Sequence, residues 1–180
     1  MTAPADAPMK SRGFTLVELL VVILIIGVLA AISYPVIRAS VAKSKQATCL
    51  SNLRNVGVGL ESYLQDHNRV MPMLAAGRSS KTDDTKVLET ELAPYLTNPD
   101  VFHCPADAKE FTKSGSSYLW NTVESGLPEN KLSFLGLTGD TQRIPLVADK
   151  EAWHPGPMST NILYADLSAS RDLRFVTQTP

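Results

Sequence analysis

Hydrophobic positions in this chain begin as one unbroken run near the N-terminus. From Leu19 to Ile32 there is no polar side chain at all. The segment 14–35 matches the ~20 residues with which an α-helix crosses the hydrocarbon core of a bilayer. A helix that is apolar on every face is buried either in a membrane or in a protein core. We predict a transmembrane helix over 14–35, with a buried core helix as the alternative.

Beyond Pro35 the hydrophobic positions become periodic. Their spacing of mostly three or four residues predicts an amphipathic helix over 36–66. Its apolar stripe would consist of Ile37, Val41, Cys49, Leu53, Val56, Leu60 and Leu64. Proline removes a backbone hydrogen bond, so Pro35 is expected to kink the helix. The pattern allows one bent helix or two helices that meet at Pro35.

The rest of the chain alternates short apolar runs with turn residues. Residues 67–85 are rich in Pro, Gly, Ser and Asp and predict a loop, and 85–96 predict a short helix. Four strand-length segments rich in β-branched or aromatic residues follow, at 117–122, 144–148, 161–165 and 173–177. The expected fold is α+β, with a small antiparallel sheet packed on the apolar stripe of the long helix.

Composition and charge narrow the classes of function. The chain has 180 residues, a hydrophobic content of 44% and a formal net charge of −1. These values fit one membrane segment plus one modest globular domain. Binding to nucleic acid would require a basic face, so no nucleic-acid partner is expected.

Glu18 is the one acidic residue in the apolar run. A carboxylate within hydrocarbon is costly and needs a partner. A cut after Gly13 would give Phe14 a new amino group one helical turn from Glu18. That pairing is strained within one chain but easy between axially shifted neighbouring helices, where it neutralises both charges. The alternative is that Glu18 marks the membrane edge and extends to water.

The segment MKSRGFTLVELLVVILIIGVLAAISYP resembles the N-terminal signature of type IV pilins and type II secretion pseudopilins. The resemblance implies that a prepilin peptidase cuts after Gly13 and methylates the new N-terminal Phe14. It also implies that Glu18 guides assembly and that Pro35 kinks the helix. The fold it implies is pilin-like.

The resemblance also implies a domain organisation and a function. Residues 1–13 would be a prepilin leader starting at Met1 or Met9, 14–35 a transmembrane and polymerisation helix, and 36–180 a periplasmic head. That head would contain the amphipathic helix over 36–66 and the C-terminal β region.

The implied function is that of a structural subunit of a type II secretion pseudopilus, stored in the inner membrane. Its partners would be other filament subunits, prepilin peptidase, the inner-membrane assembly platform and membrane lipid. Lys10 and Arg12 favour a cytoplasmic leader, although Arg38, Lys43 and Lys45 on the far flank weaken that argument. The alternatives are a minor pilin of a type IV pilus and a membrane-anchored binding module that never polymerises.

Cys49 and Cys104 are the two cysteines of the chain. Two cysteines in an exported domain favour one disulfide, which would add ~4 kcal/mol by the chain-entropy estimate. The resemblance supports this pairing, because many pseudopilin-like proteins carry one cysteine before an NL(K/R)-type helix and another in a C-P-x-D segment. Here these are CLSNLRNVG and CPAD. Two buried free thiols are the alternative.

Catalysis and zinc binding find little support in the sequence. Cys104 beside His103 could be a nucleophile with its base, but adjacent residues seldom face each other correctly. His67, His103 and His154 could bind zinc together with Cys104, yet the close spacing of ligands in a structural zinc site is missing. We expect no enzyme activity.

The segment from His154 to Asp166 is similar to the H…N-(I/V)-L-(F/Y)-A-D-G-H segment of many bacterial pseudopilin-like proteins. Leu167 and Ser168 replace its glycine and histidine, so the tight turn that the glycine would supply is in question. Major pseudopilins bind calcium in a C-terminal loop. The candidate ligands here are Asp149, Asp166 and Asp172. Apart from possible calcium, no cofactor is expected.

Overall fold

The computed structural model describes residues 13–175, which belong to two compact units divided between Ser40 and Val41. The α-helices are α1 (Leu16–Asp66), α2 (Leu88–Glu91) and α3 (Glu110–Ser114). Four 3-10 helices are η1 (Ala93–Tyr95), η2 (Pro99–Phe102), η3 (Thr122–Glu124) and η4 (Glu129–Lys131). The strands are β1 (Tyr118–Trp120), β2 (Ser133–Phe134), β3 (Leu137–Thr138), β4 (Pro145–Asp149), β5 (Ile162–Tyr164) and β6 (Ala169–Ser170). The predicted leader falls on residues 1–12 and Gly13, and all of it except Gly13 lies outside the described residues.

Helix α1 is one continuous helix of 51 residues with Pro35 inside it. The alternative of two separate helices that meet at Pro35 is therefore wrong. Proline removes one backbone hydrogen bond, and α1 continues through Pro35 despite that loss. A kink at Pro35 stays a prediction.

The second half of α1 carries the apolar stripe into the core of the second unit, which we call the head (residues 41–175). The stripe is fully buried from Cys49 through Leu53, Val56 and Leu60 to Leu64, whereas Ile37 and Val41 are exposed. The stripe prediction is thus confirmed from Cys49 onward.

Two glycines let neighbouring segments approach α1 closely. A Cβ on Gly57 would lie 3.1 Å from Leu163 Cδ1 and 3.3 Å from the backbone oxygen of Leu167, and one on Gly59 would lie 2.8 Å from Leu96. Each glycine lowers helix stability by about 1 kcal/mol relative to alanine. Both nevertheless have a packing role, because a side chain at either position would be too close to its neighbours.

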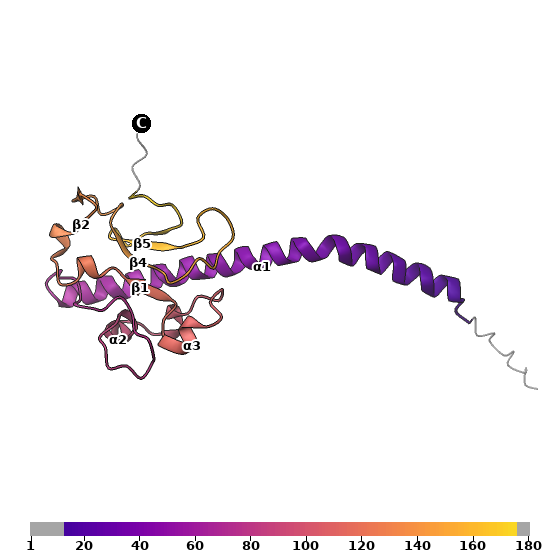
Figure 1. The fold of residues 1–180 in the computed structure, drawn as a ribbon, viewed down its shortest axis with the longest axis horizontal. Helices are drawn as coiled ribbons and strands as arrows, with labels where there is room; N and C mark the ends of the chain where they lie inside the picture. Colours follow the sequence, from indigo (N-terminus) through magenta and orange to yellow (C-terminus); the bar gives the residue numbers. More distant parts are fainter. Residues whose placement is uncertain (1–12, 176–180) are drawn as a thin grey trace, which may run out of the picture. The chain divides into compact units, whose positions relative to one another are not determined.

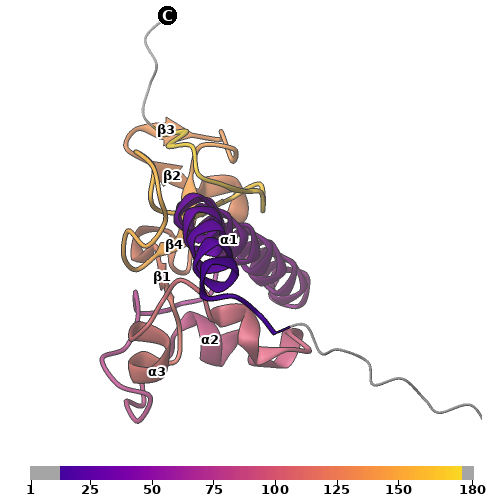
Figure 2. The ribbon, with the colours of Figure 1, turned by 90° about the vertical axis from the view of Figure 1, so that its right-hand side faces the viewer.

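The main sheet is antiparallel with the strand order β1-β4-β5-β6. Tyr118 pairs with Asp149, Ala148 pairs with Ile162, and a register shift lies between Pro145 and Val147. β2 and β3 form a separate hairpin. In Figure 1, β4 and β5 run beside the magenta half of α1, and Figure 2 shows α2 and α3 on the opposite side of the head from β2 and β3.

Three of the four predicted strands form, as β1, β4 and β5, but the prediction of a strand over 173–177 is wrong. The last strand is β6, residues 173–175 are not in a strand, and 176–177 lie outside the described residues. The reason is local: the Tyr164 hydroxyl donates to the Asp172 carbonyl (2.5 Å) and accepts from the Arg174 N–H (3.0 Å). A side chain thus uses backbone groups that a strand would need.

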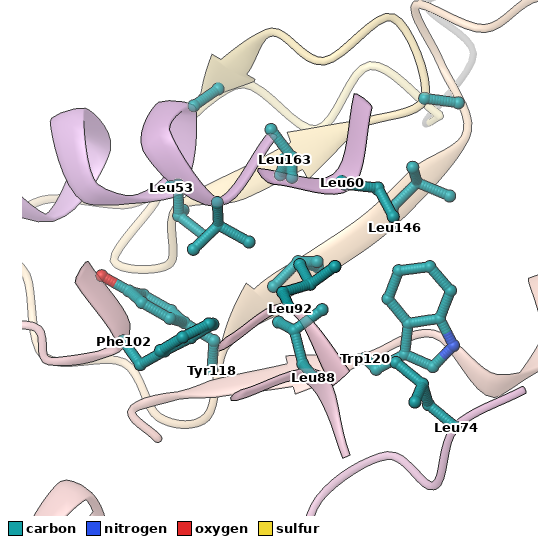
Figure 3. Close-up of a cluster of buried hydrophobic side chains, with 14 of the residues drawn as sticks. Leu53, Leu60, Leu74, Leu88, Leu92, Phe102, Tyr118, Trp120, Leu146 and Leu163 are labelled. Carbon is teal, nitrogen blue, oxygen red and sulfur yellow. The ribbon is translucent and has the colours of Figure 1, made fainter. Parts of the chain in front are cut away.

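The core lies between α1 and the sheet. Figure 3 shows Leu53 and Leu60 of α1 facing Leu146 and Leu163 of the sheet, with Leu88, Leu92, Phe102 and Trp120 closing the other side. The short helix predicted over 85–96 forms as α2 and η1, and the loop predicted over 67–85 contains one isolated bridge, from Val70 to Pro128. The expected α+β fold, a long N-terminal helix with a small antiparallel sheet, is confirmed.

Candidate functional site

The predicted cleavage and assembly residues lie at the start of α1. Gly13 and Phe14 precede the helix, and Thr15 and Glu18 form a reciprocal capping arrangement. Glu18 Oε2 accepts from the Thr15 N–H (2.8 Å) and from the Thr15 hydroxyl (2.7 Å), while the Glu18 N–H donates to Thr15 Oγ1 (3.2 Å). Such a box satisfies donors that a helix N-terminus leaves free. The pattern T-x-x-E is readable in the sequence, but our sequence analysis missed it.

The first unit exposes apolar side chains on every face of α1. All residues from Gly13 to Val41 are exposed, among them Phe14, Leu24 and Ile32. By length and composition α1 could cross a membrane. An apolar surface of this extent calls for lipid or other helices around it.

The predicted disulfide between Cys49 and Cys104 is present and fully buried. It joins α1 to the segment that follows η2. Hydrogen bonds hold the same junction: Asn52 Nδ2 donates to the His103 carbonyl (2.8 Å), and the Cys104 N–H donates to Ser117 Oγ (3.0 Å). The cysteines are therefore structural, and the alternative of two free thiols is wrong.

Asp107 explains the C-P-x-D segment. Its carboxylate accepts from the backbone N–H groups of Lys109, Glu110 and Phe111, each at 2.8 Å, and from the Ser117 hydroxyl at 2.6 Å. Burial raises the pKa of Asp107, but these hydrogen bonds lower it by more. The pKa of Asp107 therefore lies below its ordinary value. The Asp107 carboxylate thus caps the N-terminal end of α3. The sequence analysis did not predict this role.

A buried polar cluster lies against the disulfide. His154 Nε2 is 3.5 Å from Cys104 Sγ and 3.3 Å from Asp149 Oδ2, and Asp149 Oδ2 also accepts from the Asn161 N–H (2.7 Å). Asp149, His154 and Asn161 are all buried. Several of their side-chain atoms lack a hydrogen-bond partner: Asp149 Oδ1, His154 Nδ1 and both amide atoms of Asn161.

The other two candidate calcium ligands, Asp166 and Asp172, accept hydrogen bonds within turns. Asp166 Oδ1 accepts from the Ser168 N–H and hydroxyl, and Asp166 Oδ2 lies 3.6 Å from Arg174 Nη1. Asp172 accepts from the Ser170 hydroxyl. Within residues 13–175 the one group of close histidine, cysteine or acidic side chains is Cys49, Cys104 and His154. Calcium binding stays a prediction.

The turn between β5 and β6 forms although Leu167 stands where the resembling proteins have glycine. Leu167 takes a positive φ of 62°, and its N–H donates to the Tyr164 carbonyl (2.9 Å). The left-handed backbone costs a leucine about 1 kcal/mol or more. Packing of the half-buried Leu167 side chain against the core offsets that cost.

The histidines named as possible zinc ligands do not come together. The His67 ring stacks on Tyr63 with ring centroids 3.8 Å apart, and the His103 ring stacks on Phe111 with centroids 4.4 Å apart. His154 is the histidine that reaches the sulfurs. The sequence analysis named His154 with Cys104 as a possible zinc ligand, but with 50 residues between them it could not show that the two side chains meet.

Comparison with known proteins places the N-terminal segment. The prokaryotic N-terminal methylation motif matches residues 8–34. The chain is 40% identical over 60 residues to the type IV major pilin protein PilA of Myxococcus xanthus, covering 33% of this chain and 27% of that protein. It is 37% identical over 60 residues to the type II secretion system core protein G of Pectobacterium carotovorum, covering 33% and 38%.

A further relative is the type IV major fimbrial protein FimA of Dichelobacter nodosus, 40% identical over 60 residues that cover 32% of this chain and 38% of that protein. The chain thus spans only 27% to 38% of the length of these relatives. No solved structure matches the chain. Over its N-terminal third, through the methylation motif and the apolar part of α1, the chain is similar to type IV pilins and to a type II secretion core protein.

Proposed function

We propose that this protein is a structural subunit of a type II secretion pseudopilus and not an enzyme. Prepilin peptidase cuts it after Gly13 and methylates Phe14, and the helix over 14–35 anchors it in the inner membrane with its head in the periplasm. The observation that carries the proposal is the uncovered apolar surface of α1 up to Val41, with Glu18 at its start. Packing against other subunits, docked on the inner-membrane assembly platform, covers that surface in the filament.

Glu18 directs assembly by exchanging partners. In the single chain its carboxylate is held by the N–H and hydroxyl of Thr15, both neutral donors. In the filament the amino group of Phe14 on a neighbouring subunit replaces them. An ionised partner in a dry environment forms a stronger hydrogen bond than a neutral one, so the exchange favours the assembled state.

The Glu18 proposal is tested by variants expressed in cells that contain the peptidase and assembly platform. Glu18→Ala and Glu18→Gln should be cleaved and inserted in the membrane but lost from sheared or cross-linked filaments by at least ~10-fold, the ratio that 1.4 kcal/mol represents. Thr15→Ala is the matched control, because it removes half of the capping box and keeps the carboxylate. It should assemble. Equal loss in Thr15→Ala and Glu18→Gln would assign Glu18 to helix capping alone, and normal assembly of Glu18→Ala would refute a polymer held by this residue.

Maturation is tested on the protein purified from the same cells. Mass spectrometry should find a chain that begins with N-methylated Phe14. A chain that keeps the leader, or one cut behind the apolar segment, contradicts the proposal. This readout is independent of filament formation, so it also separates a failure of cleavage from a failure of assembly.

A minor pilin of a type IV pilus is the second candidate, because the relatives include pilins as well as a type II secretion protein. Deletion of the gene separates the two. A pseudopilin mutant should retain its secreted proteins in the periplasm and keep its surface pili, whereas a pilin mutant should lose pili and still secrete. A membrane-anchored binding module that never polymerises would show neither defect.

A further inference from the structure

Three buried side chains, Cys49, Cys104 and His154, converge inside the head, and a fourth, Asp149, lies beside the histidine. Cys49 comes from α1, Cys104 from the segment after η2, Asp149 from the end of β4, and His154 from the loop after β4. One ligand atom from each of Cys49, Cys104 and His154 lies within 4.8 Å of the others. Asp149 Oδ2 approaches the same histidine nitrogen at 3.3 Å.

Several polar side-chain atoms in and beside this cluster make no hydrogen bond. Asp149 Oδ1 and His154 Nδ1 have no partner, and neither have the two side-chain amide atoms of Asn161. Buried polar atoms are nearly always hydrogen-bonded, and an unpaired one costs about 1–3 kcal/mol. The side chains beside the sulfurs therefore form a polar site within the core, and His154 Nε2 and Asp149 Oδ2 are the atoms that face each other there.

The spacing of the ligand atoms fits a tetrahedral metal. Zinc binds sulfur, nitrogen and oxygen at about 2.0–2.3 Å, so the edges of its coordination tetrahedron are about 3.3–3.8 Å. The two edges that the cluster already contains are 3.5 Å (Cys104 Sγ to His154 Nε2) and 3.3 Å (His154 Nε2 to Asp149 Oδ2). We propose that, once the disulfide is reduced, Cys49, Cys104, His154 and Asp149 bind a zinc ion.

The chemistry balances with a dithiol as reductant. The dithiol gives two electrons to the sulfur–sulfur bond, which breaks; Cys49 and Cys104 become thiols, and the reductant becomes a disulfide. Zinc then displaces one proton from each thiol, because thiolate is the form that binds metal. Neutral His154 binds through Nε2, and the Asp149 carboxylate exchanges its contact with that nitrogen for the metal.

The two states exclude each other, since sulfurs joined in a disulfide cannot act as thiolates. Both states link α1 to the segment after η2. The zinc form therefore keeps this connection where the disulfide is reduced.

The test uses the full-length protein in detergent, with and without reduction by a trialkylphosphine, which carries no competing thiol. The reduced protein should bind a single zinc ion per chain and the oxidised protein none. Cobalt in place of zinc should give the sulfur-to-metal charge-transfer absorption and the intense visible bands of a tetrahedral site. Zinc should also protect both thiols from alkylation.

Variants assign the ligands. His154→Gln should weaken zinc binding by at least ~100-fold, the upper end of what even an outer-shell change costs, and Asp149→Asn should alter the cobalt spectrum. His103→Gln is the matched control, since His103 is next to Cys104 in the chain but stacks on Phe111. Each variant is first purified oxidised, so that an intact disulfide and a native circular dichroism spectrum exclude misfolding.

Two results would overturn the proposal. One is a reduced protein that shows no thiolate–cobalt absorption and no zinc protection from alkylation. The other is a His154→Gln variant that binds zinc as tightly as His103→Gln. Should His154→Gln not fold, the alkylation and cobalt measurements on the wild-type protein still decide whether the site exists.

Discussion

Glu124, at the end of η3, is a fully buried carboxylic acid. One of its oxygens accepts from the Ser133 N–H (3.2 Å), and the other has no partner. Burial raises the pKa of Glu124, and the hydrogen bond from Ser133 offsets this only in part. Because the folded state holds the proton more tightly than the unfolded state, the stabilisation from Glu124 is complete at low pH and is lost as the pH rises through the folded pKa.

Glu124→Gln should therefore stabilise the head near neutral pH. The neutral amide avoids the cost of a buried charge, and we expect the free energy of unfolding to rise by about 1 kcal/mol. Urea unfolding followed by tryptophan fluorescence measures it, since Trp120 is buried in the core. The gain should vanish once the pH falls below the ordinary glutamate value of 4.5, and the exposed Asp84→Asn should change nothing at either pH. A gain that persists in acid would mean that ionisation is not its cause.

Residues at the N-terminus could be read from the sequence because their chemistry is local. Glu18 stands out as an acid in an apolar run, and Thr15 lies within one turn of it. His154 and Asp107 could not be read in the same way. Their partners are distant or are backbone N–H groups, and one sequence does not reveal which loops meet.

Among the elements, α1 uses glycine for two different purposes. A Cβ on Gly57 would meet the side chain of Leu163 and the backbone of Leu167, whereas one on Gly27 would meet nothing within 4 Å. Both residues lower the intrinsic helix propensity equally. Of these two glycines, only Gly57 offsets that loss, because its missing side chain lets Leu163 and Leu167 pack closely against α1.

Gly57→Ala should destabilise the head by about 1–3 kcal/mol, because overpacking outweighs the gain in helix propensity. Gly27→Ala is the control in the same helix and should leave the urea midpoint of the head unchanged. Chemical unfolding of both proteins in detergent provides the comparison. A Gly57→Ala protein as stable as the wild type would show that β5 and the turn after it can move away from α1.

Element predictions succeeded where the apolar pattern was long or rich in β-branched residues, as in α1 and β4. They failed for β2 and β3, because two residues per strand give no visible alternation. The turn between these strands also departs from the usual signature: Leu135 has a positive φ of 48°, followed by Gly136 at 81°, where Asn-Gly or Asp-Gly is the common choice. The predicted strand over 173–177 failed because the Tyr164 hydroxyl binds the backbone at Asp172 and Arg174, at the start of that segment.

For the molecule as a whole, the disulfide closes a long covalent loop. Cys49 and Cys104 are 55 residues apart, and that loop includes α2, η1 and η2. Cross-linking reduces the conformational entropy of the unfolded chain, and a loop of this length is worth roughly 4 kcal/mol in that account. The head thereby compensates for its short strands.

The paired replacement Cys49→Ala with Cys104→Ala should lower the free energy of unfolding by about 2–4 kcal/mol. Urea unfolding in detergent, followed by the fluorescence of Trp120, gives the value. Reduced wild-type protein is the control, because it keeps both cysteine side chains and loses only the cross-link. A paired variant with the stability of the wild type would mean that the folded core compensates fully for the lost cross-link.

The position of the disulfide has a mechanical consequence. Cys49 lies in the first buried turns of α1, so tension applied along the helix from its N-terminal end reaches a covalent bond near the edge of the core. That bond passes the load to the segment after η2, and the short strands are spared from shearing. A subunit pulled by its helix would therefore load that segment through a covalent bond as well as through packing.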